Sequence, residues 1–397
     1  MRHSNFADGG FGPQFRITAF VAVVLLFCWG CNSDDKTDTG GGLDTETALE
    51  GVEINGTDNR RITSECTADE ECDDGDPCTL GYCVLGECAY RHDFIPVYSK
   101  QLDVSGEVSR ASIIGERVYA TLRGDTPSIQ IYNVPSIAEA TLRDSAILTG
   151  QANALAVTWN AYAIGFSVGG IQLFSTDNLS TPAYAEFPDI GVLEQIDIVT
   201  GVAISNNNLW VAGYEEGVTL ITGDIGSPNR VGTVDTIGRA VAIDARGGSA
   251  LVADSLGGVV SITQQDNVPV AGTPVTTIGR VVDVDSNHRS AIVAEYGAGF
   301  SLLDVSNMSA PRRLVRVETK RAVVAVKMIG AQTALVLFID GTLWRVGFLN
   351  YKIPRLMEVV KLGGKPIENG LDFYNAQGVV TMADGRVILL HNGCTYE

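Results

Sequence analysis

The chain has 397 residues, of which 45% are hydrophobic and 19% charged, and its 28 Lys and Arg against 47 Asp and Glu give a formal net charge of −19. The hydrophobic content excludes a disordered chain, because it is sufficient to build a core. The shortage of basic residues argues against nucleic acid as a partner, and we expect none.

The first thirty residues have the order of a secretory signal peptide. Two arginines precede an apolar stretch at positions 17–27, which is shorter than the roughly 20 residues that a membrane-spanning helix needs. The following Gly30-Cys31 resembles the end of a bacterial lipoprotein signal, in which the cysteine becomes lipidated. We therefore expect residues 1–30 to be a lipoprotein signal peptide and Cys31 to carry the lipid that anchors the protein to a membrane. An ordinary signal peptide, with Cys31 incidental, is the alternative.

Residues 31–65 are predicted to form a flexible acidic tether. Nine acidic and three basic side chains lie between positions 32 and 65, together with three consecutive glycines and hardly any apolar cluster. Like charges extend such a linker by repulsion. The sequence thus predicts an exported protein that is held off the outer membrane or cell surface on a stalk.

A disulfide-rich module is predicted for residues 66–93. An exported chain favours disulfides, and an even number of cysteines remains after Cys31. A zinc site is disfavoured because the spacing lacks paired C-x2-C units. These six cysteines, which allow up to three disulfides, are Cys66, Cys72, Cys78, Cys83, Cys88 and Cys394. Their segment resembles small Cys-rich modules of exported myxobacterial proteins, which implies a spacer or contact module without assigned chemistry.

Calcium is an alternative ligand of this module. Asp73, Asp74 and Asp76 are close in sequence, but calcium takes about six to eight oxygen ligands and no EF-hand spacing is present. Solvated carboxylates in a turn are the simpler interpretation, and we expect no cofactor.

From residue 94 onward the chain repeats itself. One unit usually begins with Pro and ends about ten residues later in Gly or Arg, and a second unit consists of a turn residue followed by alternating apolar residues. The copies of the first unit start at positions 96, 140, 182, 228, 269, 311 and 354. Four short strands in each period of about 43 residues are typical of a β-propeller blade. Residues 94–397 are therefore predicted to be an all-β, seven-bladed β-propeller.

The two ends of the repeat region predict how the ring closes. The first Pro unit precedes any other strand, and the last blade lacks a Pro unit after its final strand. Residues 96–105 can then pair with the strand ending near His391 and leave no exposed sheet edge. This pairing places Cys394 near the Cys-rich module, and we expect it to bond there, most simply to Cys88. An unpaired or intermolecular Cys394 is the alternative.

The strand Phe300-SLLDVSNMSAP, with weaker copies at Ile171-QLFSTDNLSTP and Val218-TLITGDIGSP, resembles the LVIVD repeat of bacterial surface proteins. This resemblance covers about residues 94 to 397, and blades one and six depart from it. It implies a secreted or surface propeller without an assigned reaction, and it supplies no catalytic residues.

Residues for catalysis are sparse. The four histidines are dispersed, and no nucleophile elbow, phosphate-binding loop or HExxH motif is present. Carboxylates on the first strands could instead meet across the channel, although they could also be turn or strand-end residues with local hydrogen bonds. They are Asp244, Asp283, Asp285 and Asp372. A calcium-dependent propeller hydrolase resembling lactonases is therefore the enzymatic alternative.

Four arginines recur with the repeat. Arg110, Arg239, Arg280 and Arg321 each stand just before the expected first strand of a blade, and the last three are 41 residues apart. Equivalent strand starts lie on one rim of the channel, so these guanidinium groups could bind an anion such as a carboxylate, a phosphate or an acidic peptide. In the alternative interpretation, each arginine pairs with an Asp of the neighbouring blade and braces the ring.

Taken together, the sequence predicts a non-enzymatic binding or scaffolding module of the cell envelope with a protein or glycan as partner. A purely structural envelope protein is the remaining alternative.

Overall fold

The computed structural model describes residues 66–393, except positions 73, 75–77, 93–97, 137–138, 169, 177–197, 224–227 and 349–353. The predicted signal peptide, Cys31 and the tether lie outside the described residues. Within the described part, no helix has the length and apolar character needed to cross a membrane.

The Cys-rich module is a small hairpin with a preceding turn. Its elements are a short 3-10 turn and two antiparallel strands, namely η1 (Asp69–Cys72), β1 (Thr79–Val84) and β2 (Glu87–His92). Two disulfides tie the segment before the hairpin to the hairpin itself, Cys66–Cys83 and Cys72–Cys88. The module therefore has a cystine core, as the sequence predicts.

The expected Cys88–Cys394 bond is wrong. Cys88 lies opposite Cys83 in the hairpin, and both cysteines reach back to the preceding turn instead of forward to the end of the chain. Cys66, Cys72 and Cys88 pack together as the buried centre of the module, so Cys88 is used within it. Cys78 is also disulfide-bonded, and Cys394 lies outside the described residues.

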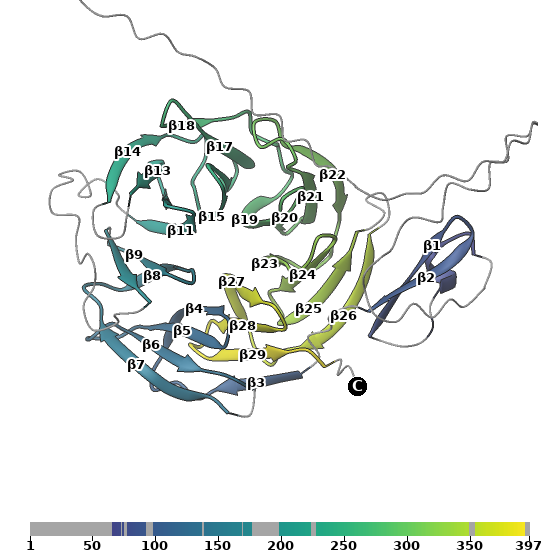
Figure 1. Cartoon of the computed structure of the whole chain (residues 1–397), viewed down its shortest axis with the longest axis horizontal. Helices are drawn as coiled ribbons and strands as arrows, with labels where there is room; N and C mark the ends of the chain where they lie inside the picture. The colour runs from purple at the N-terminus through teal and green to yellow at the C-terminus, as the bar shows by residue number, and fades with distance from the viewer. Residues whose placement is uncertain are drawn as a thin grey trace, which may run out of the picture. The chain divides into compact units, whose positions relative to one another are not determined.

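Seven antiparallel sheets surround a common axis (Figure 1), as expected for a seven-bladed propeller. Each blade begins with the strand nearest the axis. Blades 1 to 3 consist of β4 (Val108–Ile114), β5 (Arg117–Leu122), β6 (Ser128–Asn133) and β7 (Thr141–Ile147); β8 (Ala152–Val157), β9 (Ala161–Phe166) and β10 (Ile171–Ser175); and β11 (Val199–Ser205), β12 (Asn208–Gly213), β13 (Gly217–Thr222) and β14 (Asn229–Val234).

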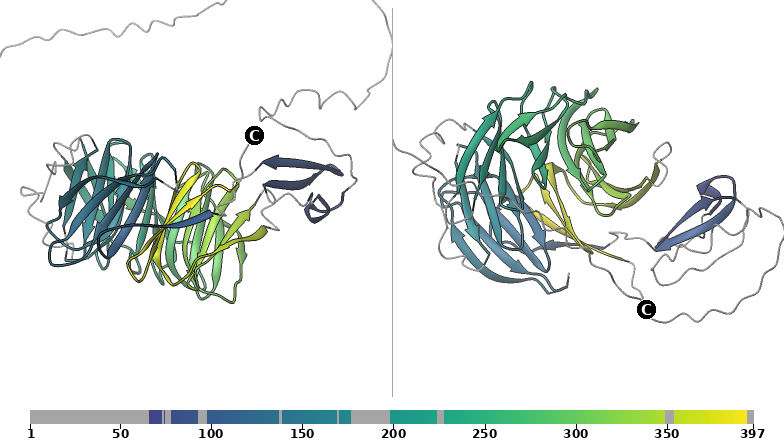
Figure 2. Two further views of the ribbon diagram at one scale, coloured as in Figure 1. Left: turned by 90° about the horizontal axis from the view of Figure 1, so that it is seen from below. Right: turned by 45° about the horizontal axis from the view of Figure 1, so that its top comes forward.

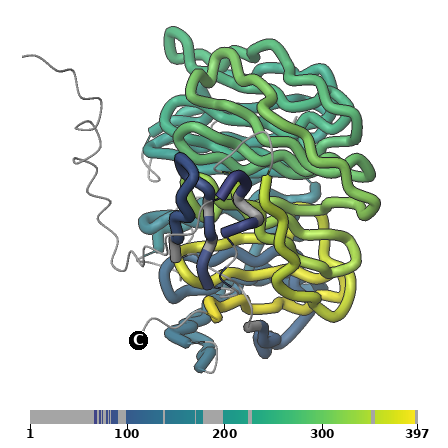
Figure 3. The backbone as a smooth tube through the Cα atoms, turned by 90° about the vertical axis from the view of Figure 1, so that its right-hand side faces the viewer, coloured from purple at the N-terminus to yellow at the C-terminus, as the bar shows by residue number. Residues whose placement is uncertain are grey.

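Blades 4 to 6 continue the pattern of four strands. They consist of β15 (Ala242–Arg246), β16 (Ser249–Ala253), β17 (Val259–Gln265) and β18 (Val268–Ala271); β19 (Arg280–Ser286), β20 (Ser290–Tyr296), β21 (Gly299–Asp304) and β22 (Arg312–Val317); and β23 (Val323–Met328), β24 (Thr333–Phe338), β25 (Thr342–Gly347) and β26 (Arg355–Lys361). Figure 2 shows the propeller edge-on, and Figure 3 shows the chain running back and forth within each blade.

Blade 7 combines strands from both ends of the propeller. β27 (Pro366–Tyr374), β28 (Gln377–Met382) and β29 (Val387–His391) are completed by β3 (Tyr98–Leu102). β3 pairs with β29 in antiparallel register, with Lys100 opposite Leu389. This pairing confirms the predicted closure of the ring.

The hydrophobic core is divided among the seven interfaces between adjacent blades. One buried cluster joins blade 5 to blade 6 through Phe300 and Phe338, and six further clusters join the remaining pairs. Because both faces of a blade are covered, the second strands are mostly apolar and buried, as in β9. This packing leaves the polar residues of the first strands at the axis.

Candidate functional site

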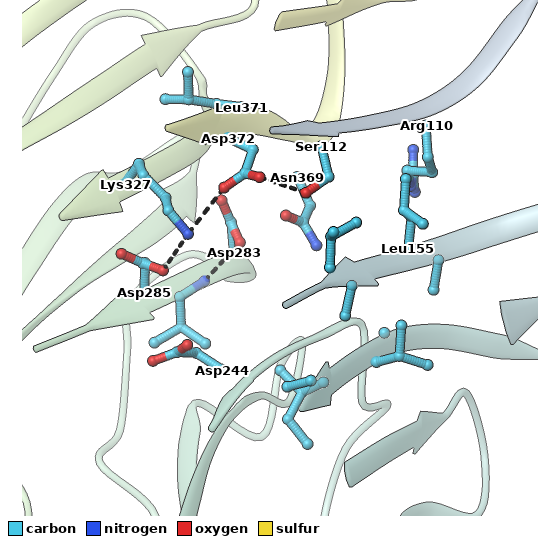
Figure 4. A pocket seen from close by; sticks show the side chains of 18 of the residues that line it. Arg110, Ser112, Leu155, Asp244, Asp283, Asp285, Lys327, Asn369, Leu371 and Asp372 are labelled. Atoms are coloured by element: carbon cyan, nitrogen blue, oxygen red, sulfur yellow. Dashed lines mark hydrogen bonds and ion pairs between the residues drawn. The ribbon is translucent and has the colours of Figure 1, made fainter. Parts of the chain in front are cut away.

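A cavity of ≈ 200 Å³ lies on the propeller axis and is lined by the first strand of every blade (Figure 4). All four carboxylates that the sequence placed on first strands line it, namely Asp244, Asp283, Asp285 and Asp372. The structure thus brings together the predicted channel carboxylates.

Three of these carboxylates join neighbouring blades. The backbone N–H groups of Val326 and Met328 in blade 6 donate to Asp283 at 2.8 Å and to Asp285 at 2.7 Å. The N–H of Ile113 in blade 1 donates to Asp372 at 3.0 Å. Apart from a 2.9 Å bond from Val284 N–H to Asp283, these hydrogen bonds are not the local ones considered from the sequence. They cross blade boundaries and hold the first strands together.

Lys327 supplies the positive charge among these carboxylates. Its Nζ lies 2.9 Å from Oδ1 of Asp285 and 3.2 Å from Oδ1 of Asp372. Burial lowers the pKa of Lys327, but the fields of Asp285, Asp372 and Asp244 outweigh burial and raise this pKa well above its ordinary value. The ammonium group therefore makes the contacts with these acids that a bound cation would make.

Two cavity carboxylates have a raised pKa. Burial, with the charge of Asp285 as a further contribution, raises the pKa of Asp244 to about 6. Burial also raises the pKa of Asp283 to about 7, against the opposing effect of the Val326 N–H bond. The cavity is consequently less negative near neutral pH than its four carboxylates suggest.

The geometry gives no metal cluster for the hydrolase alternative within the described residues. There, the one group of metal-ligand atoms that converges belongs to Cys66, Cys72 and Cys88, which are in disulfides. Asp74 accepts a 2.6 Å hydrogen bond from Thr79 Oγ1, whereas Asp73 and Asp76 lie outside the described residues.

The histidines are also absent from the cavity lining. His288 is exposed in a turn, and His391 Nδ1 contacts the carbonyl of Asn392. His92 ends β2 of the Cys-rich module, and His3 lies outside the described residues. No described histidine is therefore placed to act as a base at the channel.

Arg110 is separated from the other three arginines. It lies inside β4, not before it. β4 has a bulge between Val108 and Arg110, as β19 has between Val281 and Asp283, so Arg110 is the counterpart of Asp283 and not of Arg280. Its side chain lines the cavity. Burial, reinforced by the charge of Arg123, lowers its pKa to about 10, so the guanidinium stays protonated at neutral pH.

The other three arginines stack on aromatic rings near the starts of first strands. The guanidinium carbon of each lies 4.5–4.9 Å from the ring centroid of its neighbour. The pairs are Arg239 with Tyr214, Arg280 with Tyr296, and Arg321 with Phe338. Such stacking fixes a guanidinium group while leaving its edge able to donate.

Each of these three arginines also has a carboxylate partner. Arg239 contacts Glu215 at 3.1 Å, and Arg280 makes a two-point contact with Glu368 of blade 7. Arg321 contacts Asp340 and Glu358 of its own blade at 3.4 and 3.6 Å. None of these partners is an Asp of a neighbouring blade, as the bracing interpretation requires, although Glu215 is a carboxylate of the neighbouring blade 3. Anion binding at the arginines stays a prediction.

Two rim loops share the sequence Thr-Ile-Gly-Arg, at residues 236–239 and 277–280. Asp254 accepts Thr236 Oγ1 at 2.6 Å and Gly238 N–H at 2.7 Å. Glu295 accepts the N–H groups of Ile278 at 3.0 Å and Gly279 at 3.5 Å. Both carboxylates are fully buried, so each is an internal anchor for its loop.

The anchored loops present large aliphatic side chains to solvent. Ile237 is 80% exposed, Ile278 is 70% exposed, and Leu256, in the adjacent turn between β16 and β17, is 84% exposed. Ser255 and Val281 pair as a β-bridge, which brings the Leu256 turn beside the second loop. We call Ile237, Arg239, Leu256, Ile278 and Arg280 the blade 4 rim.

Sequence reasoning included Arg239 and Arg280 but missed the exposed aliphatic residues of the blade 4 rim and missed Lys327. The repeated tetrapeptide was a signal for the rim, because an apolar residue in a solvent-exposed loop is seldom repeated by chance. Alignment of the first strands would have placed Lys327 level with Asp285, since 42 residues separate them. Asp254 and Glu295 carried no such signal, because each is a single acidic residue at or just after the end of an apolar strand.

No protein-family model matches the chain, and no curated protein matches it. The chain is similar in structure to the protein of "Structure of U3-55K", with a TM-score of 0.60 and 12% identity over 75% of this chain and 100% of that one. It is also similar to the RRP9 WD40 repeats, with a TM-score of 0.58 and 12% identity over 74% and 97% of the two chains. For the Neurospora crassa Pan2 WD40 domain these values are 0.55 and 10%, over 74% and 91%. At such low identity the likeness shows the fold, a seven-bladed β-propeller with WD40-like structural neighbours.

Proposed function

We propose that the protein is a cell-envelope lipoprotein whose propeller binds a partner protein through the blade 4 rim. The observation that carries this proposal is the exposure of Ile237, Leu256 and Ile278 beside two stacked arginines. A buried carboxylate holds each of the two loops, so the surface is ordered before binding and little conformational entropy is lost.

The chemistry of the rim favours a protein segment that combines apolar and acidic side chains. Aliphatic side chains gain by being covered with apolar surface, which favours a protein over a glycan. Arg239 and Glu215 are 55% and 63% exposed, and such an exposed pair contributes only about 0–1 kcal/mol. An incoming carboxylate can therefore replace Glu215 at little cost. The WD40 domains among the structural neighbours are consistent with a protein partner.

Export is supported by the disulfides of the Cys-rich module. Such bonds persist in oxidising compartments, and the signal with Cys31 is the proposed route to a lipid anchor at the outer membrane or cell surface. Labelled palmitate fed to expressing cells should enter the wild-type chain and not a Cys31→Ser variant. Equal labelling of the two chains would reject the anchor.

The partner is tested by capture from detergent-solubilised envelopes with the full chain as bait. We expect the double variant Ile237→Ser/Ile278→Ser to lose the captured protein, because it removes exposed apolar contacts. Ile147→Ser is the matched control, since Ile147 is also 70% exposed but lies at the end of β7, the outermost strand of blade 1. Equal capture by the wild type and the double variant would overturn the proposal.

A charge-reversal variant tests the arginines independently. Arg239→Glu/Arg280→Glu should weaken capture, whereas Arg312→Gln, at the start of the outermost strand of blade 5, should not. Unchanged capture by the double variant would show that the partner makes no use of the two guanidinium groups.

A further inference from the structure

Three polar groups that line the central cavity have no strong partner among the described residues. The guanidinium of Arg110 makes one weak contact, 3.4 Å from Nη1 to the carbonyl of Ser109. Asp244 uses Oδ2 to accept the hydroxyl of Ser286, and its Oδ1 has no hydrogen bond in the described part of the molecule. The side-chain amide of Asn369 is likewise unbonded there. All three side chains are half-buried and line the cavity, so their polar atoms are accessible to a ligand there.

These available groups lie on opposite sides of the cavity. Arg110 and Asn369 come from β4 and β27, the first strands of adjacent blades 1 and 7. Asp244 comes from β15 in blade 4, three blades away from either in the ring of seven. Figure 4 shows Arg110 and Asp244 across the cavity from one another. Hydrogen-bond donors and a carboxylate oxygen without a hydrogen bond thus lie on opposite sides of the cavity.

Local backbone geometry positions the two hydrogen-bond donors, Arg110 and Asn369. In β4, Arg110 takes the position just after the bulge that Asp283 has in β19, and residues at this position line the cavity. In β27 the register is irregular between Pro366 and Leu371, and Asn369 adopts a positive φ of 51°, which Asn tolerates better than most residues. Non-glycine residues with such backbone are concentrated at binding sites.

The remaining walls of the cavity leave space and add little charge of their own. Blades 2 and 3 contribute small residues to the lining, which are Ala154, Ala156, Gly201 and Ala203. Lys327 is paired with Asp285 and Asp372, and both oxygens of Asp283 accept backbone N–H groups. These groups already have partners in the neighbouring strands, in contrast to Arg110, Asn369 and Oδ1 of Asp244.

We propose that the central cavity binds a small zwitterion, an amino acid or related aminocarboxylate. Its carboxylate contacts Arg110 and Asn369, and its ammonium group contacts Oδ1 of Asp244. A cavity of ≈ 200 Å³ is below the roughly 300–1,000 Å³ of pockets for drug-sized ligands, which excludes an oligosaccharide or a folded peptide. A ligand with one charge would leave either Arg110 or Asp244 without a partner, and the site discriminates against it for that reason.

The proposal is tested by isothermal titration calorimetry on the full chain. The probes are glycine, β-alanine, γ-aminobutyrate and 5-aminovalerate, which differ in the distance between their charges, with propionate and propylamine as singly charged controls. We expect at least one zwitterion to bind, and the singly charged compounds to bind about tenfold more weakly or not at all. Absence of binding by every zwitterion, or equal binding of propionate, would overturn the proposal.

Variants then assign the two ends of the ligand. Arg110→Gln and Asp244→Asn should each weaken binding of the zwitterion about tenfold or more, whereas Arg312→Gln on the outermost strand of blade 5 should not change it. Asn369→Gly keeps the positive φ without strain and should also weaken binding, which covers the case in which Arg110→Gln fails to fold. Unchanged affinity in Asp244→Asn would overturn the assignment of the ammonium group.

The outcome is independent of the proposed protein partner. Loss of binding at Asp244 leaves the blade 4 rim intact, and the Ile237→Ser/Ile278→Ser variant should bind the zwitterion as the wild type does. Weaker binding of the zwitterion by that double variant would contradict the separation of the two sites.

Discussion

Asp254 anchors Gly238 through a hydrogen bond, since one carboxylate oxygen accepts the glycine N–H at 2.7 Å. The aspartate side chain is fully buried. A Cβ at position 238 would lie 2.2 Å from the carbonyl oxygen of Asp254, so only glycine permits this approach. The loop carrying Ile237 and Arg239 is thus fixed by a residue that is not exposed at the surface.

Asp254→Ala should destabilise the fold by about 2 kcal/mol, because it leaves the Thr236 hydroxyl and the Gly238 N–H without an acceptor. Urea unfolding followed by circular dichroism measures this loss. Asp125→Ala, at an exposed turn position, is the control and should change stability by less than about 0.5 kcal/mol. A stability of Asp254→Ala equal to that of the control would show that the loop is held by other contacts.

Lys327→Met should be more damaging, at about 3–5 kcal/mol at neutral pH, because Asp285 and Asp372 would remain buried without their counter-charge. Urea unfolding measures this loss, and Lys361→Met, on the exposed end of β26, is the control. A loss as small as that of the control would contradict the assigned role of Lys327.

The pKa of Asp244 predicts a decrease in stability with rising pH. Burial raises this pKa from 3.8 to about 6, so between these values the folded chain binds more protons than the unfolded chain does. The free energy of unfolding therefore falls as pH rises from about 4 to 6 and levels off above that range. Asp244→Asn lacks this contribution, and its stability relative to the wild type should increase by on the order of 1 kcal/mol across the range. Parallel stability curves for the two proteins would reject the shifted pKa.

Cys78 should be linked to Cys394. The other four cysteines of the module are paired with one another, Cys78 is disulfide-bonded, and processing at Cys31 would remove Cys28 and acylate Cys31. Peptide mapping of the unreduced protein by mass spectrometry should yield one peptide pair containing both residues, which separates on reduction. Recovery of Cys394 as a free thiol would contradict this pairing.

The fold was predictable because it repeats. The number of copies of a short pattern gives the number of blades, which is seven. The first Pro unit lies ahead of every other strand, and this position identified β3 as the partner of β29. The disulfide connectivity was not predictable in this way. Cys83 and Cys88 face each other in the hairpin, and only the packing of the preceding turn determines that each bonds upstream.

The candidate sites were predicted in part. Asp244, Asp283, Asp285 and Asp372 do meet at the axis, because equivalent strands place them there. Arg110 was assigned to the rim since its place in the chain resembles that of Arg280, but it lies three residues further along its strand, level with Asp283. Hydrophobic periodicity indicates which side chains of a strand are buried, but it does not indicate this for a loop. The exposure of Ile237 and Ile278 could therefore not be predicted from it.

The pairing of β3 with β29 makes the propeller dependent on its last strand. These strands lie near opposite ends of the described chain, so during synthesis or export the ring stays open until β29 arrives, and such distant pairings form slowly. Until then β3 and β28 have unpaired edges that can associate with other strands. Proteolysis that removes residues 387–391 would have the same effect, since it detaches β3 and opens the ring at blade 7. A protease acting at that one site would convert a closed disc into an open chain of blades.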